Sequence, residues 1–165
     1  MKQENFRVLV LCTGNSARSQ IADALINARG AKRLAGRVSA TSAGSHPATH
    51  VNQFAIEILR NHGVPFAERT PRSMNDVAHE QFDLVITVCD NARDACPIFP
   101  STAVQVHWGL ADPAHVTPDS AARQAFAQTF AEIAVRVDAL LALPLETLSA
   151  AELKNRAEAI HQSAL

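Results

Sequence analysis

A cysteine, an arginine and a serine lie close together near the start of the chain, at a spacing that suits the binding of a tetrahedral oxyanion. Backbone N–H groups in a short turn can converge on one anion, and the N-terminus of a following helix adds positive potential. Arg18 offers a planar fork that holds two oxygens at once. The residues of this predicted loop are Cys12, Thr13, Gly14, Asn15, Ser16, Ala17, Arg18 and Ser19.

The same loop gives Cys12 a chemical role. A positive environment lowers the pKa of a thiol and favours the thiolate, which is the nucleophilic form. We therefore expect the loop to lower the pKa of Cys12, with Ser19 donating to the thiolate and Asn15 pinning the loop. A cysteine and an arginine with five residues between them also occur together by chance, so the strand before and the helix after them carry much of the weight.

Asp112 is the candidate general acid. When a thiolate attacks a tetrahedral oxyanion, an oxygen must leave, and a carboxylic acid within reach can protonate it. Asp112 follows the fourth predicted strand and would lie over the same edge of the sheet as Cys12. An aspartate before a proline is also a common turn residue, which is the alternative interpretation.

Two further cysteines follow the third predicted strand, Cys89 directly and Cys96 seven residues later. If that strand lies next to the first, Cys12 and Cys89 end strands about 4.8 Å apart, and a disulfide needs Cα atoms about 4.4–6.8 Å apart. Oxidation could then pass outward, with Cys89 attacking Cys12 and Cys96 attacking Cys89. The alternatives are buried cysteines that act as small hydrophobic residues, or a zinc site, for which the spacing is too long. We expect no metal site.

The hydrophobic pattern predicts the elements that must position these residues. Strands are expected at residues 6–11, 37–41, 82–88 and 103–108. Helices are expected at residues 19 to about 35, 52 to about 61, 118 to about 143, and after a capping box at 149–152. Residues 64–76 are expected to form a loop.

Apolar strands that alternate with helices indicate an α/β fold, with a doubly wound four-stranded parallel sheet in the order 2-1-3-4 and helices on both faces. Ligands of such sheets bind beyond the carboxyl ends of the strands, where the first and third strands meet. The chain has 165 residues, which we expect to form a single domain over 1–165.

Composition limits the classes of partner. The formal net charge is −1, so no basic surface indicates nucleic acid or a membrane. No apolar run approaches the roughly 20 residues of a spanning helix. An odd number of cysteines fits a reducing compartment, so we expect a cytoplasmic protein, and nothing in the chain demands more than a monomer.

Taken together, these residues resemble the arsenate reductases that are built on the low-molecular-weight tyrosine phosphatase fold. The matching segments are residues 11–20, 42–44, 51–52, 86–90, 96–97 and 108–113. The chain resembles the thioredoxin-linked branch in particular, because both downstream cysteines have that branch's spacing. Phosphatases of the fold usually have a cysteine where Ala17 stands and aromatic residues after the Asp-Pro pair, whereas this chain has Ala114, His115 and no tyrosine.

The resemblance implies reduction of arsenate to arsenite without a cofactor. Cys12 would attack arsenate while Arg18 and the loop amides hold its oxygens, and Asp112 would protonate the departing oxygen. Cys89 would then form a Cys12–Cys89 disulfide and release arsenite, and Cys96 would convert it to a Cys89–Cys96 disulfide. The segment between the last two cysteines would rearrange and expose the Cys89–Cys96 disulfide, which thioredoxin, or else glutaredoxin or a small thiol, would then reduce.

Two other functions remain as alternatives. A phosphatase acting on phosphotyrosine or a small molecule needs only Cys12, Arg18, Ser19 and Asp112, and leaves the other two cysteines without a role. A sensor of redox state or of oxyanions would use the thiols and leave Asp112 idle. Arsenate reduction gives every candidate residue a defined role, so we favour it.

Overall fold

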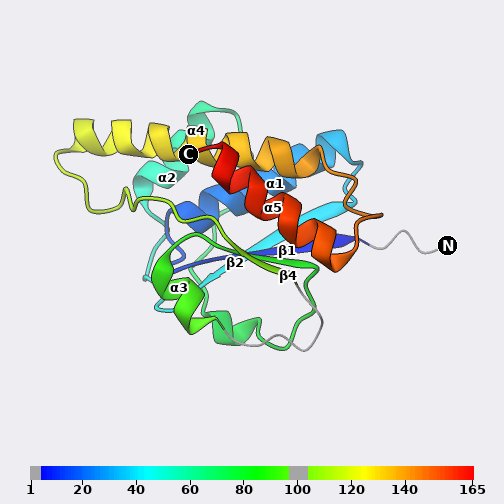
Figure 1. Cartoon of the computed structure of the whole chain (residues 1–165). Helices are drawn as coiled ribbons and strands as arrows, with labels where there is room; N and C mark the ends of the chain where they lie inside the picture. Colours follow the sequence, from blue (N-terminus) through cyan, green and yellow to red (C-terminus); the bar gives the residue numbers. More distant parts are fainter. Residues whose placement is uncertain (1–4, 97–103) are drawn as a thin grey trace.

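A parallel four-stranded sheet forms the centre of the structure, a computed structural model that describes residues 5–96 and 104–165 (Figure 1). The strands are β1 (Phe6–Cys12), β2 (Val38–Gly44), β3 (Leu84–Thr87) and β4 (Val104–His107). They lie in the order β2-β1-β3-β4, and every neighbouring pair is parallel. The predicted order is therefore confirmed. Ala103, the expected start of the fourth strand, lies outside the described residues.

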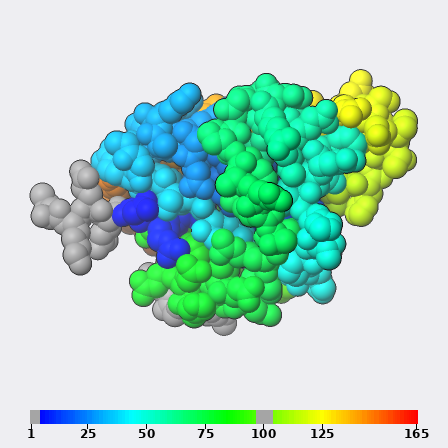
Figure 2. Space-filling model, turned by 180° about the vertical axis from the view of Figure 1, so that it is seen from behind, coloured from blue at the N-terminus to red at the C-terminus, as the bar shows by residue number. Residues whose placement is uncertain are grey.

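Helices cover both faces of the sheet, as expected, but to different extents. On one side lie α1 (Arg18–Arg33), α2 (Gln53–Asn61), α4 (Asp119–Leu141) and α5 (Ala150–Ser163). On the other side lie the short helix α3 (Asp90–Ala95) and the 3₁₀ helix η1 (Met74–Asp76). Seen from behind, the chain between α2 and β3 runs across the surface of the molecule (Figure 2).

Alternate side chains of β1 enter two separate hydrophobic cores. Val8 and Val10 belong to the larger core beneath the long helices, whereas Leu9 and Leu11 belong to the smaller core beneath α3 and η1. Successive side chains of a strand point to opposite faces, so a strand covered on both faces needs an unbroken apolar run. All four residues are fully buried, which explains the run of four hydrophobic residues that leads to Cys12.

Local signals at the helix ends agree with the structure. Gly63 follows α2 with a φ of 66°, in the left-handed region that glycine adopts without a steric penalty. Ser149 and Glu152 form the expected capping box at the start of α5. Helix α1 begins at Arg18, one residue earlier than expected, and Ala17 at its N-cap gives it no capping side chain.

Two strand boundaries and two short helices differ from the prediction. Strand β2 continues to Gly44 rather than ending at Thr41, because its small and polar residues pair in register with the apolar end of β1. Strand β3 is shorter than expected, since Phe82 packs into the smaller core before the strand begins. The expected loop at 64–76 contains η1, and α3 was not expected at all, because helices this short show no periodic pattern.

The close approach of β2 to the loop after β1 requires a glycine at position 44. A Cβ atom there would lie 2.5 Å from the carbonyl oxygen of Thr13 and 3.0 Å from the backbone nitrogen of Asn15. Both atoms belong to backbone, so neither can move aside without displacing the loop. Gly44 therefore allows the end of β2 to support the loop that begins at Cys12. Among the described residues, no helix is long and apolar enough to cross a membrane.

We expect Gly44→Ala to destabilise the fold by about 1–3 kcal/mol through this clash. Urea denaturation would measure the loss of unfolding free energy. Ser39→Ala, a change on the same strand but away from the loop, serves as the control and should have a much smaller effect. Equal stability of the Gly44→Ala and wild-type proteins would contradict the proposed contact.

Candidate active site

The loop after β1 is held in place by its carbonyl groups. The carbonyls of residues 12, 13, 14 and 16 accept hydrogen bonds of 2.8–3.1 Å from the backbone N–H groups of residues 45, 46, 48 and 52. The C=O and N–H of a trans peptide point in opposite directions. The next N–H groups therefore face away from that segment. Within the described part of the chain, the backbone N–H groups of Thr13, Gly14, Ser16 and Ala17 have no acceptor.

Helix α1 adds further free donors to this loop. The first backbone N–H groups of any helix lack intrahelical partners, and at Ala17 no side chain caps them. A row of free N–H groups at the positive end of a 16-residue helix is a suitable environment for an anion. Residues 13–17 of the predicted oxyanion-binding set thus occupy the turn between β1 and α1, and Arg18 and Ser19 are the first two residues of α1.

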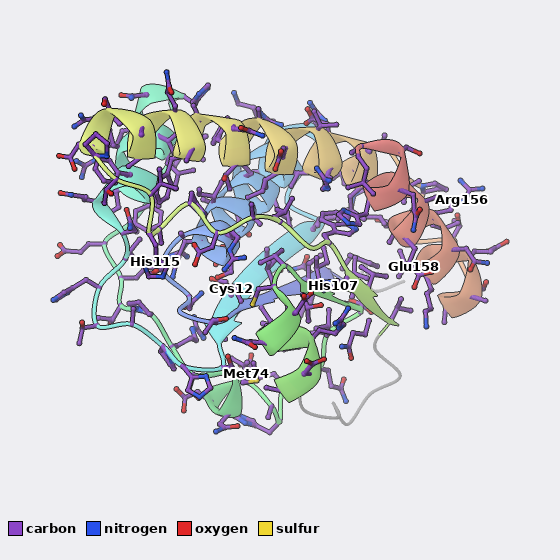
Figure 3. All side chains as sticks on the ribbon, turned by 60° about the vertical axis from the view of Figure 1, so that its left-hand side comes forward. Cys12, Met74, His107, His115, Arg156 and Glu158 are labelled. Atoms are coloured by element: carbon purple, nitrogen blue, oxygen red, sulfur yellow. The ribbon has the colours of Figure 1, made fainter. Side chains whose placement is uncertain are left out.

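The thiol of Cys12 is buried at the centre of this turn (Figure 3). Its sulfur lies 2.9 Å from the Ser19 hydroxyl and accepts the backbone N–H of Asn15 at 3.1 Å. The Asn15 side-chain amide donates to the Ser19 oxygen at 2.8 Å, which leaves the Ser19 hydroxyl proton to point at the sulfur.

The expectation of a lowered pKa for Cys12 is wrong for this structure. Burial raises the pKa of the Cys12 thiol, while hydrogen bonds from Ser19 and Asn15 and the charge of Arg18 lower it. Burial outweighs the others because a thiolate deep in the protein loses its hydration. The donors predicted to stabilise the thiolate are present, but they do not overcome the cost of burying the charge.

Asn15 ties the loop to its surroundings. Its backbone φ is 50°, a left-handed conformation that asparagine tolerates better than most residues. Its side-chain oxygen accepts the backbone N–H of Arg72 at 3.0 Å, and the Gln20 amide donates to its carbonyl at 2.9 Å. Asn15 therefore pins the loop as expected, through its side chain as well as its backbone. Gln20 is a supporting residue to which the sequence analysis gave no role.

Arg18 and Asp112 meet at the mouth of the loop. The Arg18 guanidinium donates to the carbonyl of Leu110 at 2.8 Å and lies 3.6 Å from the Asp112 carboxylate. Arg18 is buried, whereas the Asp112 side chain is 37% exposed. Asp112 also accepts the backbone N–H of Ala114 at 3.0 Å, as a turn aspartate does. Asp112 is thus a turn residue and at the same time a neighbour of Arg18.

Cys89 lies next to the loop, and Cys96 lies at the far end of α3. The Cys89 sulfur caps α3 by accepting the backbone N–H of Ala92 at 3.4 Å, and it lies 3.1 Å from the Thr13 hydroxyl. Cys96 ends the helix and packs against the smaller core, where burial raises its pKa to about 11. All three cysteines are present as thiols.

Helix α3 keeps Cys89 and Cys96 apart. An α-helix rises about 1.5 Å per residue, so the seven steps from Cys89 to Cys96 across this six-residue helix separate the two residues by about 10 Å. A disulfide needs Cα atoms no more than about 7 Å apart. The expectation that this short segment can bring the two cysteines together therefore requires α3 to unwind first.

Asp23 is a buried carboxylate on α1 that is not among the predicted site residues. It accepts hydrogen bonds from Ser42 at 2.8 Å and from Asn27 at 2.7 Å, and it lies 3.3 Å from the Arg69 guanidinium. Burial raises its pKa, and Arg69 lowers it. A charged residue within the apolar stripe of α1 was the available signal. The described residues contain no cluster of three or more His, Cys, Asp or Glu side chains that could hold a metal.

These features define a doubly wound α/β protein in which the first strand delivers a thiol to a loop of free backbone N–H groups. The sequence matches the low molecular weight phosphotyrosine protein phosphatase family over residues 7–157. This chain belongs to that family.

Proteins named arsenate reductase are among its relatives. The arsenate reductase of Halalkalibacterium halodurans is 38% identical over 107 residues, which is 65% of this chain and 73% of the relative. A crystal structure of arsenate reductase from Archaeoglobus fulgidus is 31% identical with a TM-score of 0.65, and the match covers 82% of this chain and 99% of that one. A thioredoxin-dependent arsenate reductase of Corynebacterium glutamicum is 29% identical with a TM-score of 0.62, covering 84% of this chain and 60% of that one.

Replacing Ser19 with alanine should raise the pKa of Cys12 further, because the hydroxyl at 2.9 Å lowers it. The thiolate is the form that reacts with iodoacetamide, so alkylation of Cys12 at neutral pH should slow several-fold and its pH midpoint should move up. Mass spectrometry of the labelled peptides would separate Cys12 from the other cysteines. Ser16→Ala provides the control within the same loop. An unchanged pH midpoint in Ser19→Ala would show that this hydroxyl does not stabilise the thiolate.

Proposed function

We propose that this protein reduces arsenate to arsenite through a relay of three thiols. The observation that carries this proposal is the position of Cys89, whose sulfur lies 3.1 Å from the hydroxyl of Thr13, the residue after Cys12. A phosphatase has no use for a second thiol there. Relatives named arsenate reductase, at 35–38% identity, support the same substrate. We also propose that residues 1–165 act as one domain, since the site uses residues from β1 to the loop after β4.

In the first step the loop binds arsenate and Cys12 attacks arsenic. The free N–H groups of the loop and the Arg18 guanidinium hold the oxygens, while the Cys12 proton passes to the arsenate dianion or to solvent. A sulfur–arsenic bond forms and an arsenic–oxygen bond breaks. Asp112 protonates the departing oxygen, which leaves as water. Arsenic remains in the +5 state in this adduct.

In the second step Cys89 attacks the sulfur of Cys12. The Cys12–Cys89 disulfide forms, the sulfur–arsenic bond breaks, and its electron pair stays on arsenic. Arsenic is thereby reduced to the +3 state and leaves as arsenite. The two electrons come from the two thiols that become the disulfide.

In the third step Cys96 attacks Cys89, which forms the Cys89–Cys96 disulfide and frees Cys12. This step needs α3 to unwind, which moves the disulfide away from the buried loop. We propose thioredoxin as the dithiol that then reduces it, with glutaredoxin or a small thiol as the alternative. The cycle needs reduced thiols between turnovers, a condition that the cytoplasm supplies.

A phosphatase activity is the second candidate function, because the family is named for it. The loop, Arg18 and Asp112 also suit a phosphate ester, whose phosphorus would be attacked by Cys12 in the same way. Hydrolysis of that adduct uses water and leaves Cys89 and Cys96 idle. We therefore expect only slow hydrolysis of phosphate esters.

Cys89→Ser and Cys96→Ser separate these functions. Cys89→Ser should release no arsenite, and Cys96→Ser should release one equivalent and stop at the Cys12–Cys89 disulfide. Both proteins should hydrolyse p-nitrophenyl phosphate at the wild-type rate. Arsenite would be measured after mixing with arsenate, thioredoxin, thioredoxin reductase and NADPH. Repeated turnover by both variants would refute the relay.

Asp112→Asn should lower the arsenate kcat/KM by about 100-fold, the usual range for the loss of a general acid. Asparagine keeps the oxygen that accepts the Ala114 N–H, so the turn and the thermal unfolding midpoint should change little. Steady-state kinetics and a thermal melt would test the two parts separately. A nearly wild-type kcat/KM would remove Asp112 from the mechanism.

A further inference from the structure

His107 lies outside the proposed relay and holds the start of the helix that carries Cys89. It is the last residue of β4, and its ring nitrogens bridge two elements. Nδ1 lies 2.8 Å from the Thr87 hydroxyl at the end of β3, and Nε2 lies 2.9 Å from the Asp90 carboxylate at the start of α3. Figure 3 shows the labelled His107 at the end of its strand, close to α3.

The hydrogen-bond partners determine how the neutral ring is protonated. A carboxylate can only accept, so Nε2 must carry the proton that is donated to Asp90. In the neutral ring Nδ1 is then the acceptor of a hydrogen bond from Thr87 at 2.8 Å, which is shorter than the 3.4 Å contact of the same hydroxyl with the carbonyl of Val106. Thr87 is fully buried in the sheet, so it fixes the ring from a rigid position. The result is a directed chain from Thr87 through His107 to Asp90.

Gly109 independently shows that the ring is confined on this side. A Cβ atom at position 109 would lie 3.0 Å from Nε2 of His107, the atom that contacts Asp90. With any larger residue at this position, the ring or the backbone would have to shift by a few tenths of an ångström. The backbone after β4 thus leaves just enough room for the ring in its observed place.

The first turn of α3 needs such an anchor. The helix has six residues, which is too short to be stable by itself in water. Its first turn sets the direction of the Cys89 sulfur, which accepts the N–H of Ala92 and contacts Thr13. The Asp90 side chain is 75% exposed, and the same carboxylate oxygen lies 2.9 Å from His107 and 3.7 Å from Arg93 on its own helix, so His107 is its nearer partner and the one that joins α3 to the sheet.

We propose that His107 is a positioning residue for the attack of Cys89 on Cys12. Through Asp90 it holds the first turn of α3 so that the Cys89 sulfur faces the loop. This inference rests on the proposed reductase function and deepens it. The contact acts before the first disulfide forms, because α3 must unwind for the second.

Single-turnover release of arsenite from the Cys96→Ser protein isolates that step, since this protein stops at the first disulfide. In this background we expect His107→Phe, Asp90→Ala and Gly109→Ala each to slow release by about tenfold at saturating arsenate, the effect of losing one hydrogen bond to a charged group. The half-saturating arsenate concentration should not change, because none of the three residues touches the loop.

Two further variants distinguish positioning from general loss of structure. His107→Gln places an amide N–H near Nε2 and should retain most of the rate. His107→Phe combined with Asp90→Ala should be no slower than Asp90→Ala alone, because Asp90→Ala already removes the contact with His107 together with the 3.7 Å ion pair to Arg93. Asp94→Ala is the matched control, since Asp94 is an equally exposed carboxylate on α3 and its removal leaves the contacts of Asp90 with His107 and Arg93 in place. It should release arsenite at the rate of the Cys96→Ser parent.

Unchanged release in both His107→Phe and Asp90→Ala would overturn this inference alone. Losses that multiply in the double variant would also overturn it. Failure of the Cys96→Ser parent itself to release arsenite would instead refute the proposed function. If His107→Phe does not fold, Asp90→Ala still decides the matter, because Asp90 is on the surface.

Discussion

The anchoring of the loop carbonyls is the constraint on which the rest of the site depends. A backbone turn binds an anion only if its N–H groups face the same way, and isolated turns have no reason to remain so. Here the N–H groups of the segment after β2 donate to the carbonyls of residues 12, 13, 14 and 16, and these hydrogen bonds fix the orientation of the peptide groups in the loop. The peptide planes then direct the intervening N–H groups to the opposite side. Gly44 makes this possible by letting the two segments approach.

This arrangement has an electrostatic cost at Cys12. A thiol surrounded by donors favours the thiolate, but a thiol withdrawn from water does not, and burial has the larger effect on the Cys12 pKa. Burial therefore favours the protonated thiol at Cys12. The Ser19 oxygen accepts a hydrogen bond from the Asn15 amide, which turns the Ser19 hydroxyl proton toward the sulfur, so the stabilising contacts are already in place when the Cys12 thiol loses its proton.

Helix α3 must satisfy two opposing requirements in the proposed cycle. When α3 is folded, the Cys89 sulfur caps its first turn and lies beside Thr13. Unwound, it lets Cys96 reach Cys89. A six-residue helix with one fully buried residue, Ala92, has little stability of its own, so a few side-chain contacts decide how often it opens. The contact between His107 and Asp90 is one of those contacts.

The sequence by itself determined the sheet order and the turn that places Cys12 between a buried strand and a helix, because each depends on local pattern. The four hydrophobic residues before Cys12 predict a central strand, and the order of apolar strands and helices restricts the topology. The pKa of Cys12, the existence of α3, and the contacts of His107 and Asp23 were decided only by the tertiary structure. Burial is the sum of contributions from many distant segments, and a hydrogen bond between residues 17 positions apart, such as His107 with Asp90, leaves no periodic trace in the chain.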